Sequence, residues 1–367
     1  MLSLLLKEIR HNPLLWLLVF VPAVFAAETL AHDAHTLLFV LSILSIVPRA
    51  SLLSHATESV AAKTGDSVGG LLNATLGNLT ELVIALTALR AGQYMLVKAS
   101  IAGAIVTNTL FMLGASFLLG GLKHRVQEYS RAGARFQASL LFLATIALLI
   151  PSTIAQADRA PGAVTQALSL GLAVLLIVAY GLGMLFSLKT HREFFAGTEH
   201  AEEGEAPWPM GLSLVTLAGV TVLVALVSEV FVESVQKAAE SFGMTPAFVG
   251  FIVVALVGGA AEMASAFSGA RKNRLDLSVG IALGSASQIA LFVAPVLVLR
   301  SYVMGPAPMS LEFWPGAVSM MLVATLTATL VTNGGRSAWF VGVLLLMVYA
   351  IFALTLYLLP PQAAAVP

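Results

Sequence analysis

Long apolar runs, separated by short polar connections, most constrain the fold of this chain. Only 10% of its 367 residues are charged, and a helix needs about 20 apolar residues to cross a bilayer. A bilayer offers no water to unpaired backbone groups, so each run must be helical. The runs lie approximately at residues 13–28, 36–62, 67–90, 95–121, 136–156, 162–188, 210–238, 246–270, 276–299, 312–333 and 337–359. The sequence therefore predicts an all-α polytopic membrane protein with about 11 transmembrane helices.

Basic residues in the connections predict which helix ends face the cytoplasm. With a cytoplasmic N-terminus, 13 of the 19 Lys and Arg residues fall in inner connections and five in outer ones. This asymmetry follows the positive-inside rule. No small-residue cleavage site clearly follows the run from Pro13 to Ala27, so we expect this run to be retained as a helix. The prediction is a multi-pass protein of the cell inner (plasma) membrane with its N-terminus in the cytoplasm.

One long hydrophilic connection divides the chain. Residues 189–209 carry an acidic run, which predicts a solvated cytoplasmic linker, with cation sensing as the alternative. Residues 1–35 hold an extra N-terminal helix, which leaves five helices in residues 36–188 and five in residues 210–367. Because five is an odd number, the second set must enter the membrane upside down relative to the first. Two inverted five-helix repeats are typical of secondary transporters, which bind their substrate near the bilayer midplane between the halves.

Each predicted repeat contains one isolated carboxylate at membrane depth. Glu81 is the only ionisable side chain in residues 67–89, and Glu262 is the only one in residues 244–270. A charge in the bilayer costs ~2.5 kcal/mol or more, so it is retained where it faces protein, water or an ion. Helix packing does not require a carboxylate. The pair therefore predicts a transport site built from a duplicated unit.

Glycines and carboxamides surround the two glutamates. Gly77 precedes Glu81, and Gly258 precedes Glu262, at the same spacing. Such glycine-rich segments are poor continuous helices, and a break would free backbone carbonyls that a cation can bind. Together with carboxylates and carboxamides, these carbonyls form an all-oxygen set of the kind that Ca²⁺ prefers. The predicted cation ligands are Glu81, Glu262, Asn108, Gln288, Gly77, Gly258 and Asn78.

Close helix packing is the alternative explanation for the small and polar residues near these ligands. It applies at least as well as a ligand role to Asn73, Thr75, Ser100, Ser265 and Ser285.

Two further acidic residues lie within apolar runs. Glu58 and Glu229 could line an access path or transfer protons, and they could equally be interfacial partners of Lys63 and Lys237. The predicted proton pathway consists of Glu81, Glu262, Glu58 and Glu229.

Several classes of function are disfavoured by what the chain contains. A formal net charge of zero gives no indication of a nucleic-acid partner. The chain has no cysteine, and its seven histidines show no zinc-site spacing. An intramembrane enzyme would need a Ser–His pair or paired aspartates within the spans, whereas the aspartates fall at span ends or in connections. We therefore expect a protein that is not an enzyme, has no resident cofactor and contacts the lipid bilayer; a homo-oligomer is left open.

Two segments resemble the signature regions of the calcium/proton exchanger (CAX) family of the cation/calcium exchanger superfamily. The first is GGLLNATLGNLTELVIALTALRAGQ at 69–93. The second is GFIVVALVGGAAEM at 250–263, followed by ARKNRLDLSVGIALGSASQIALFVAP at 270–295. The resemblance implies an eleven-helix fold with one extra N-terminal helix and the two glutamates as the central ion-binding carboxylates. The chain departs from the family at Gly259 and Met263, where the family usually has Asn and His.

The residues and the resemblance together predict a secondary active antiporter. It would export Ca²⁺ from the cytoplasm in exchange for H⁺ by alternating access, with both ions competing for the paired glutamates. The alternative is a Na⁺- or K⁺-coupled cation exchanger on the same fold, which the departures at Gly259 and Met263 leave open.

Overall fold

The computed structural model describes residues 9, 12–64, 69, 72, 75–156, 162–191 and 208–359. Nearly all of these residues are helical. The N-terminal half contains η1 (Pro13–Val19), α2 (Phe20–Leu30), α3 (His35–Ala61), α5 (Leu79–Arg90), α6 (Tyr94–Val106), η2 (Thr107–Met112), α7 (Leu113–His124), β1 (Val126–Glu128), α8 (Arg131–Gln156), α9 (Gly162–Leu185) and η3 (Phe186–Thr190). The C-terminal half contains α10 (Met210–Ser241), α11 (Pro246–Phe248), η5 (Val249–Val254), α12 (Ala255–Gly258), α13 (Ala260–Arg271), α14 (Leu275–Gln288), η6 (Ile289–Val293), α15 (Ala294–Ser301), α16 (Pro315–Thr332), β2 (Arg336–Ala338) and α17 (Trp339–Leu358).

The helices confirm the predicted all-helical membrane fold. Within the described residues, nine helices are long and apolar enough to cross a membrane, and a bent pair of helices would make a tenth. The predicted run 67–90 is represented by α5, and part of the run lies outside the described residues, as does most of the linker 189–209. The total of 11 helices and the inversion of the repeats stay predictions.

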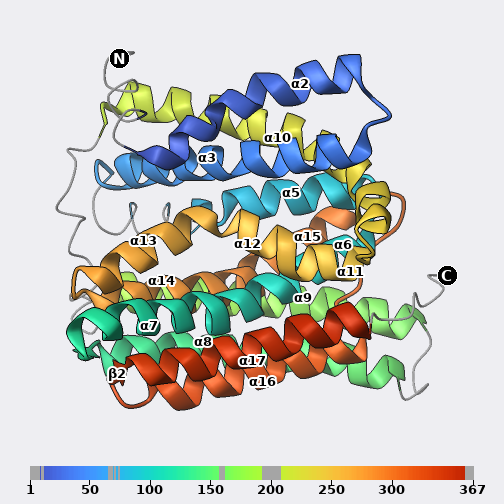
Figure 1. The fold of residues 1–367 in the computed structure, drawn as a ribbon. Coiled ribbons are helices and arrows are strands. Elements are labelled where there is room, and N and C mark those ends of the chain that lie inside the picture. Colours follow the sequence, from blue (N-terminus) through green and yellow to red (C-terminus); the bar gives the residue numbers. More distant parts are fainter. Residues whose placement is uncertain are drawn as a thin grey trace.

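The helices form three groups side by side (Figure 1). On one side lie α2, α3 and α10, and on the opposite side lie α8, α16 and α17. Between them are α5 and the broken segment α12–α13, which run in opposite directions. The continuous spans of α6–α7 and α14–α15 have the largest share of buried residues, whereas fewer than a third of the residues are buried in the apolar windows of α9, α10 and α17, as in lipid-facing helices.

The centre is closely packed because glycines allow backbones to touch. Gly103 on α6 faces the backbone of Phe251 on η5, and a Cβ atom at Gly103 would clash with the Phe251 carbonyl. A Cβ atom at Gly250 would lie 2.6 Å from Ala99 Cβ and 2.9 Å from Leu96 O. Small residues at such crossings are the usual device for close packing of membrane helices.

A buried arginine joins the two longest helices. Arg49 on α3 has no solvent exposure. Its guanidinium donates to Ser45 O at 2.7 Å, to Ser45 Oγ at 2.6 Å, and across to Leu223 O on α10 at 2.6 Å. Within the described residues its donors are met by neutral oxygens rather than by a carboxylate. These bonds hold α3 and α10 together.

The sequence did not predict a short two-stranded sheet. β1 pairs antiparallel with β2, with Gln127 opposite Ser337. Gln127 Nε2 also donates to Ala270 O at 2.9 Å and to Asn273 Oδ1 at 3.0 Å. The sheet therefore ties together three connections at the end of the molecule that the basic residues predict to be cytoplasmic.

Candidate functional site

Both glutamates lie in the first turn of a helix that follows a break. Glu81 is in the first turn of α5, whose N-cap residue is Asn78. Glu262 is in the first turn of α13, whose N-cap residue is Gly259. Glycine and asparagine favour such starts, since glycine stabilises a helix poorly and asparagine prefers caps to helix interiors.

The predicted helix break is present in the second predicted repeat. The segment Pro246–Gly258 is bent by 58° relative to Ala260–Arg271. In the first predicted repeat, Gly77 and Asn78 form a turn directly before α5. Carbonyls at the end of the helix before a break lose their helical partners, so they become available to a cation.

The two carboxyl groups meet at these breaks. Glu81 lies against Gly258, where a Cβ atom would be 2.9 Å from Glu81 Cγ and 3.4 Å from Glu81 Oε1. Glu81 and Glu262 are close enough to interact electrostatically. Oε2 of Glu262 is enclosed and has no hydrogen-bond partner among the described residues. A buried carboxylate oxygen without a donor is costly, and a bound cation or proton would satisfy it.

A chain of neutral side chains links the two halves. Asn108 Nδ2 donates to Ser285 Oγ at 2.8 Å, and Ser285 Oγ donates to Asn78 Oδ1 at 2.8 Å. Asn78 Nδ2 then donates to Gln288 Oε1 at 2.8 Å. The predicted carboxamides Asn78, Asn108 and Gln288 are therefore brought together. Ser285, for which packing was the alternative explanation, is the residue that joins them.

Unusual helical turns occur beside two of these carboxamides. The π-helical segment η2 begins at Thr107 and includes Asn108, and η6 begins directly after Gln288. Such turns are frequently found at functional sites. They occur at the corresponding place in each predicted repeat.

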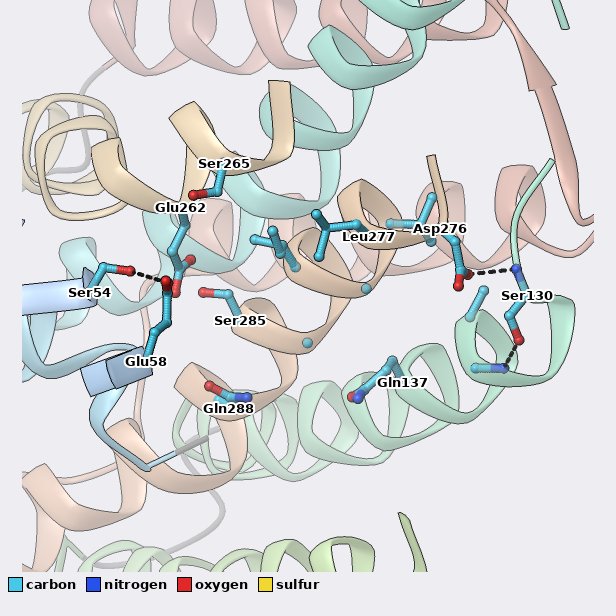
Figure 2. A pocket seen from close by; sticks show the side chains of 17 residues that line it. Ser54, Glu58, Ser130, Gln137, Glu262, Ser265, Asp276, Leu277, Ser285 and Gln288 are labelled. Carbon is cyan, nitrogen blue, oxygen red and sulfur yellow. Dashed lines mark hydrogen bonds between the residues drawn. The ribbon is translucent and has the colours of Figure 1, made fainter. Parts of the chain in front are cut away.

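A cavity of about 260 Å³ extends from this cluster towards one end of the molecule. Figure 2 shows Glu262, Ser285 and Gln288 near one end and Asp276 and Ser130 near the other. Asp276 Oδ1 accepts a hydrogen bond of 2.7 Å from the backbone N–H of Ser130, so the starts of α8 and α14 are joined there. The cavity therefore reaches from the glutamates to the end that carries the inner connections.

Only one of the two additional acidic residues lines this cavity. Glu58 does so beside Glu262, and its Oε1 accepts a hydrogen bond of 2.9 Å from Ser54 Oγ (Figure 2). Glu229 forms an exposed ion pair of 3.2 Å with Arg90. The structure thus brings Glu58 to the glutamate cluster and leaves Glu229 elsewhere on α10.

Several lining residues were missed by the sequence analysis, and the polar residues Ser54 and Gln137 are two of them. Ser54 lies one helical turn before Glu58, and Gln137 lies on α8, where its Oε1 accepts a hydrogen bond of 2.8 Å from Ser287 Oγ. The signal for Gln137 was available, because it is a carboxamide within an apolar run, like Asn108. Ser54 carries no distinguishing signal.

The donor set suits a hard cation. Among the described residues, no group of three or more His, Cys, Asp or Glu side chains could hold a metal ion. The oxygens near the cluster come from two carboxylates, carboxamides, a hydroxyl and the carbonyls at the breaks. Such a set of oxygens fits a hard cation that passes through as substrate.

An all-helical membrane protein with paired glutamates at helix breaks has the architecture of a secondary cation transporter. The comparisons with known proteins agree with this class. The model of the sodium/calcium exchanger protein family matches residues 34–189 and 212–358. The chain belongs to this family, and the resemblance to its calcium/proton exchangers is confirmed.

Similar proteins match the chain over nearly its full length. A Ca²⁺/H⁺ antiporter of Aphanothece halophytica is 39% identical over 359 residues, covering 94% of this chain and 96% of that protein. The Ca²⁺/H⁺ antiporter ChaA of Bacillus subtilis (strain 168) is 39% identical over 335 residues, covering 90% and 95%. The structure of native YfkE matches with a TM-score of 0.82 and 36% identity, covering 95% of this chain and all of that one. An H⁺/Ca²⁺ exchanger, CAX, shares the fold with a TM-score of 0.74 at 17% identity.

Proposed function

We propose that this protein is an antiporter that exports Ca²⁺ from the cytoplasm in exchange for H⁺. The observation that carries the proposal is the meeting of two glutamates, one from each predicted repeat, at helix breaks beside a cavity. The names of the relatives that match most of the chain support the choice of ions.

Competition for the same oxygens would couple the two ions. Two carboxylates with one Ca²⁺ are locally neutral, and so are two carboxyl groups with two protons. An empty, doubly ionised site would leave unpaired charges in the low-dielectric centre, which is costly. The loaded forms are therefore the ones that switch between inward and outward access. A protein that changes access only when loaded exchanges Ca²⁺ for protons.

The cavity supplies one half of the ion path. It reaches the end of the molecule where the basic connections 123–135 and 271–274 lie. The positive-inside rule makes this end cytoplasmic, so the described arrangement is open towards the cytoplasm. Glu58 lies along this path and would pass protons or attract cations. Glu229, beside Arg90, would serve the proton path from the other end of the site. The location follows as the plasma membrane, with the N-terminus in the cytoplasm.

A Na⁺- or K⁺-coupled exchanger is the second candidate. The observation that favours it is the pair Gly259 and Met263 beside Glu262, where neither side chain can carry a proton. Purified protein in proteoliposomes would distinguish the two. With an imposed pH gradient, and Na⁺ and K⁺ equal on both sides, we expect Ca²⁺ to move against the proton flux. Ca²⁺ flux that is independent of the pH gradient and is driven by a Na⁺ or K⁺ gradient would overturn the proposal that H⁺ is the exchanged ion.

Removal of the carboxamide of Asn108 or of Gln288 should weaken Ca²⁺ binding. Asn108→Ala and Gln288→Ala each delete a carboxamide from the series of hydrogen bonds that links the two halves. We expect the half-saturating Ca²⁺ concentration of exchange to rise about three- to tenfold, because one hydrogen-bonded or ligand oxygen is worth ~1 kcal/mol. Concentration dependence of flux in proteoliposomes measures the change.

A matched control is Gln166→Ala. Gln166 is also a carboxamide, and it donates to Tyr302 and Met309 away from the cavity. It should retain the wild-type concentration dependence. If Asn108→Ala and Gln288→Ala behave like this control, the two carboxamides do not contribute to ion binding.

A further inference from the structure

The two predicted repeats differ at the position three residues before each glutamate. Asn78 lies three residues before Glu81, and Gly259 lies three residues before Glu262. Both residues occupy the N-cap of the helix that carries the glutamate. Their backbones are alike, with φ −96° and ψ 28° at Asn78 and φ −79° and ψ 7° at Gly259. Position 259 is therefore the counterpart of position 78, without its carboxamide.

The carboxamide of Asn78 engages the oxygen of Gln288. Asn78 is 2% exposed, and its Nδ2 donates to Gln288 Oε1 at 2.8 Å. Gln288 is the residue just before the π-helical segment η6, and Asn108 is the second residue of the π-helical segment η2. In this pairing of an N-cap residue with a carboxamide beside a π-helical segment, Gln288 Oε1 thus already accepts a hydrogen bond from the N-cap residue Asn78.

The corresponding pairing, of position 259 with Asn108, lacks a donor because Gly259 has no side chain. A Cβ atom built at Gly259 would lie 3.7 Å from Asn108 Oδ1, so an amide on a side chain there could reach this oxygen. Asn108 donates through its Nδ2 to Ser285, and no hydrogen bond within the described residues ends on its Oδ1. Glu262 Oε2, the buried carboxylate oxygen on α13, also has no donor among these residues. Each half thus presents one acceptor oxygen that no described protein group engages: Asn108 Oδ1 in the first half and Glu262 Oε2 in the second.

The backbone does not require glycine at this position. The φ of −79° is ordinary for any residue. The nearest atoms to a Cβ atom would be Ala255 O and Met263 Cε, both at 3.3 Å, and the methionine end can move. Gly258 is different, because a Cβ atom there would press on Glu81. The absence of a side chain at 259 therefore has a consequence for the site rather than for the fold.

We propose that Gly259 determines how this protein holds its cation, by leaving Asn108 Oδ1 free to be a direct ligand together with Glu262. Gln288, whose oxygen is engaged by Asn78, then acts as a positioning residue. The substrate is a hard divalent cation held between Asn108 of the first half and Glu262 of the second half. An oxygen that accepts no hydrogen bond has both lone pairs for a cation. This inference rests on the proposed function.

Equilibrium binding of radiolabelled Ca²⁺ to the purified full-length protein tests the inference without any proton gradient. Gly259→Asn supplies an amide donor to Asn108 Oδ1, as Asn78 does to Gln288. We expect the Kd for Ca²⁺ to rise about fivefold, which corresponds to ~1 kcal/mol. Asn108→Ala should raise the Kd more than Gln288→Ala. In the Asn108→Ala background, Gly259→Asn should have no further effect, because the residue through which it acts is gone.

Two comparison variants distinguish the effect of an added hydrogen-bond donor on the Kd from the effect of added side-chain volume. Gly259→Ala adds the Cβ atom without a donor, so its shift in Kd should be much smaller than that of Gly259→Asn. Gly162→Asn makes the same substitution at the start of α9, where nothing lies within 4 Å, and should bind Ca²⁺ like the wild type. Thermal unfolding of each purified variant verifies that it is folded.

The outcomes distinguish this inference from the proposed function. Suppose that the wild-type protein binds Ca²⁺. If the Kd of Gly259→Asn then equals that of Gly259→Ala, or is lower than that of the wild type, the role of Gly259 is overturned while the proposed function stands. Additive effects of Asn108→Ala and Gly259→Asn would do the same. Wild-type protein that binds no Ca²⁺ overturns the proposed function, and the inference fails with it.

Discussion

Replacement of either Glu81 or Glu262 by glutamine is expected to reduce Ca²⁺/H⁺ exchange to the level of protein-free vesicles. Glutamine keeps the size of the side chain and removes its charge. One glutamate alone cannot neutralise a divalent ion, and glutamine cannot carry the proton in exchange. Because Glu81 packs against Gly258 and interacts electrostatically with Glu262, the two substitutions should be equally severe. Proton-driven Ca²⁺ uptake into proteoliposomes measures the loss.

The control for this prediction is Glu240→Gln. Glu240 is an exposed glutamate near the end of α10, outside the cavity, so its substitution should leave exchange unchanged. Size-exclusion profiles of all three variants should match the wild type, since a neutral amide avoids any unpaired buried charge. Near-normal uptake by either Glu81→Gln or Glu262→Gln would show that the site has been assigned to the wrong residues.

The second large effect is expected on folding, at Gly103→Val. The helix α6 approaches η5 so closely at Gly103 that a Cβ atom would clash with the backbone of Phe251. Backbone cannot move aside as a flexible side chain can, so the substitution should cost ~3 kcal/mol or more, at the upper end of overpacking effects. We expect a lower yield of monodisperse protein and a lower thermal midpoint in detergent.

Gly171→Val is the matched comparison for that substitution. Gly171 lies within α9, is exposed, and has nothing within 4 Å of a Cβ atom. The two variants carry the same change in helix propensity, so their difference isolates the contact with Phe251. Equal stability of the two variants would mean that α6 and η5 are not packed as the structure has them.

The membrane spans could be predicted closely from sequence because their signal is local. The predicted run 162–188 corresponds to the span Gly162–Thr190, and the predicted run 210–238 corresponds to Met210–Ser241. Each span needs only enough apolar residues in a row, which no distant contact can change. The short strands β1 and β2 were not predicted, since three-residue strands leave no periodic pattern and depend on a distant partner.

The residues of the site could be predicted from the sequence, but the hydrogen bonds between them could not. Isolation in an apolar run identified Glu81 and Glu262, and the same logic identified Asn108 and Gln288. It could not reveal that Ser285 joins Asn108 to Asn78, because small hydroxyl residues at helical spacing usually mean packing. It also could not separate Glu58, which lines the cavity, from Glu229, which pairs with Arg90.

The sequence by itself determined that the chain lies in a membrane as helices and that each half carries one glutamate among glycines, because hydrophobicity and charge are properties of single residues and short runs. Only the tertiary structure decided which oxygens face one another and which already accept a hydrogen bond. Asn108 and Gln288 look alike in the sequence, yet Gln288 Oε1 accepts from Asn78 while Asn108 Oδ1 faces the space at Gly259. That difference arises where helices far apart in the chain come within hydrogen-bonding distance, and no local pattern encodes it.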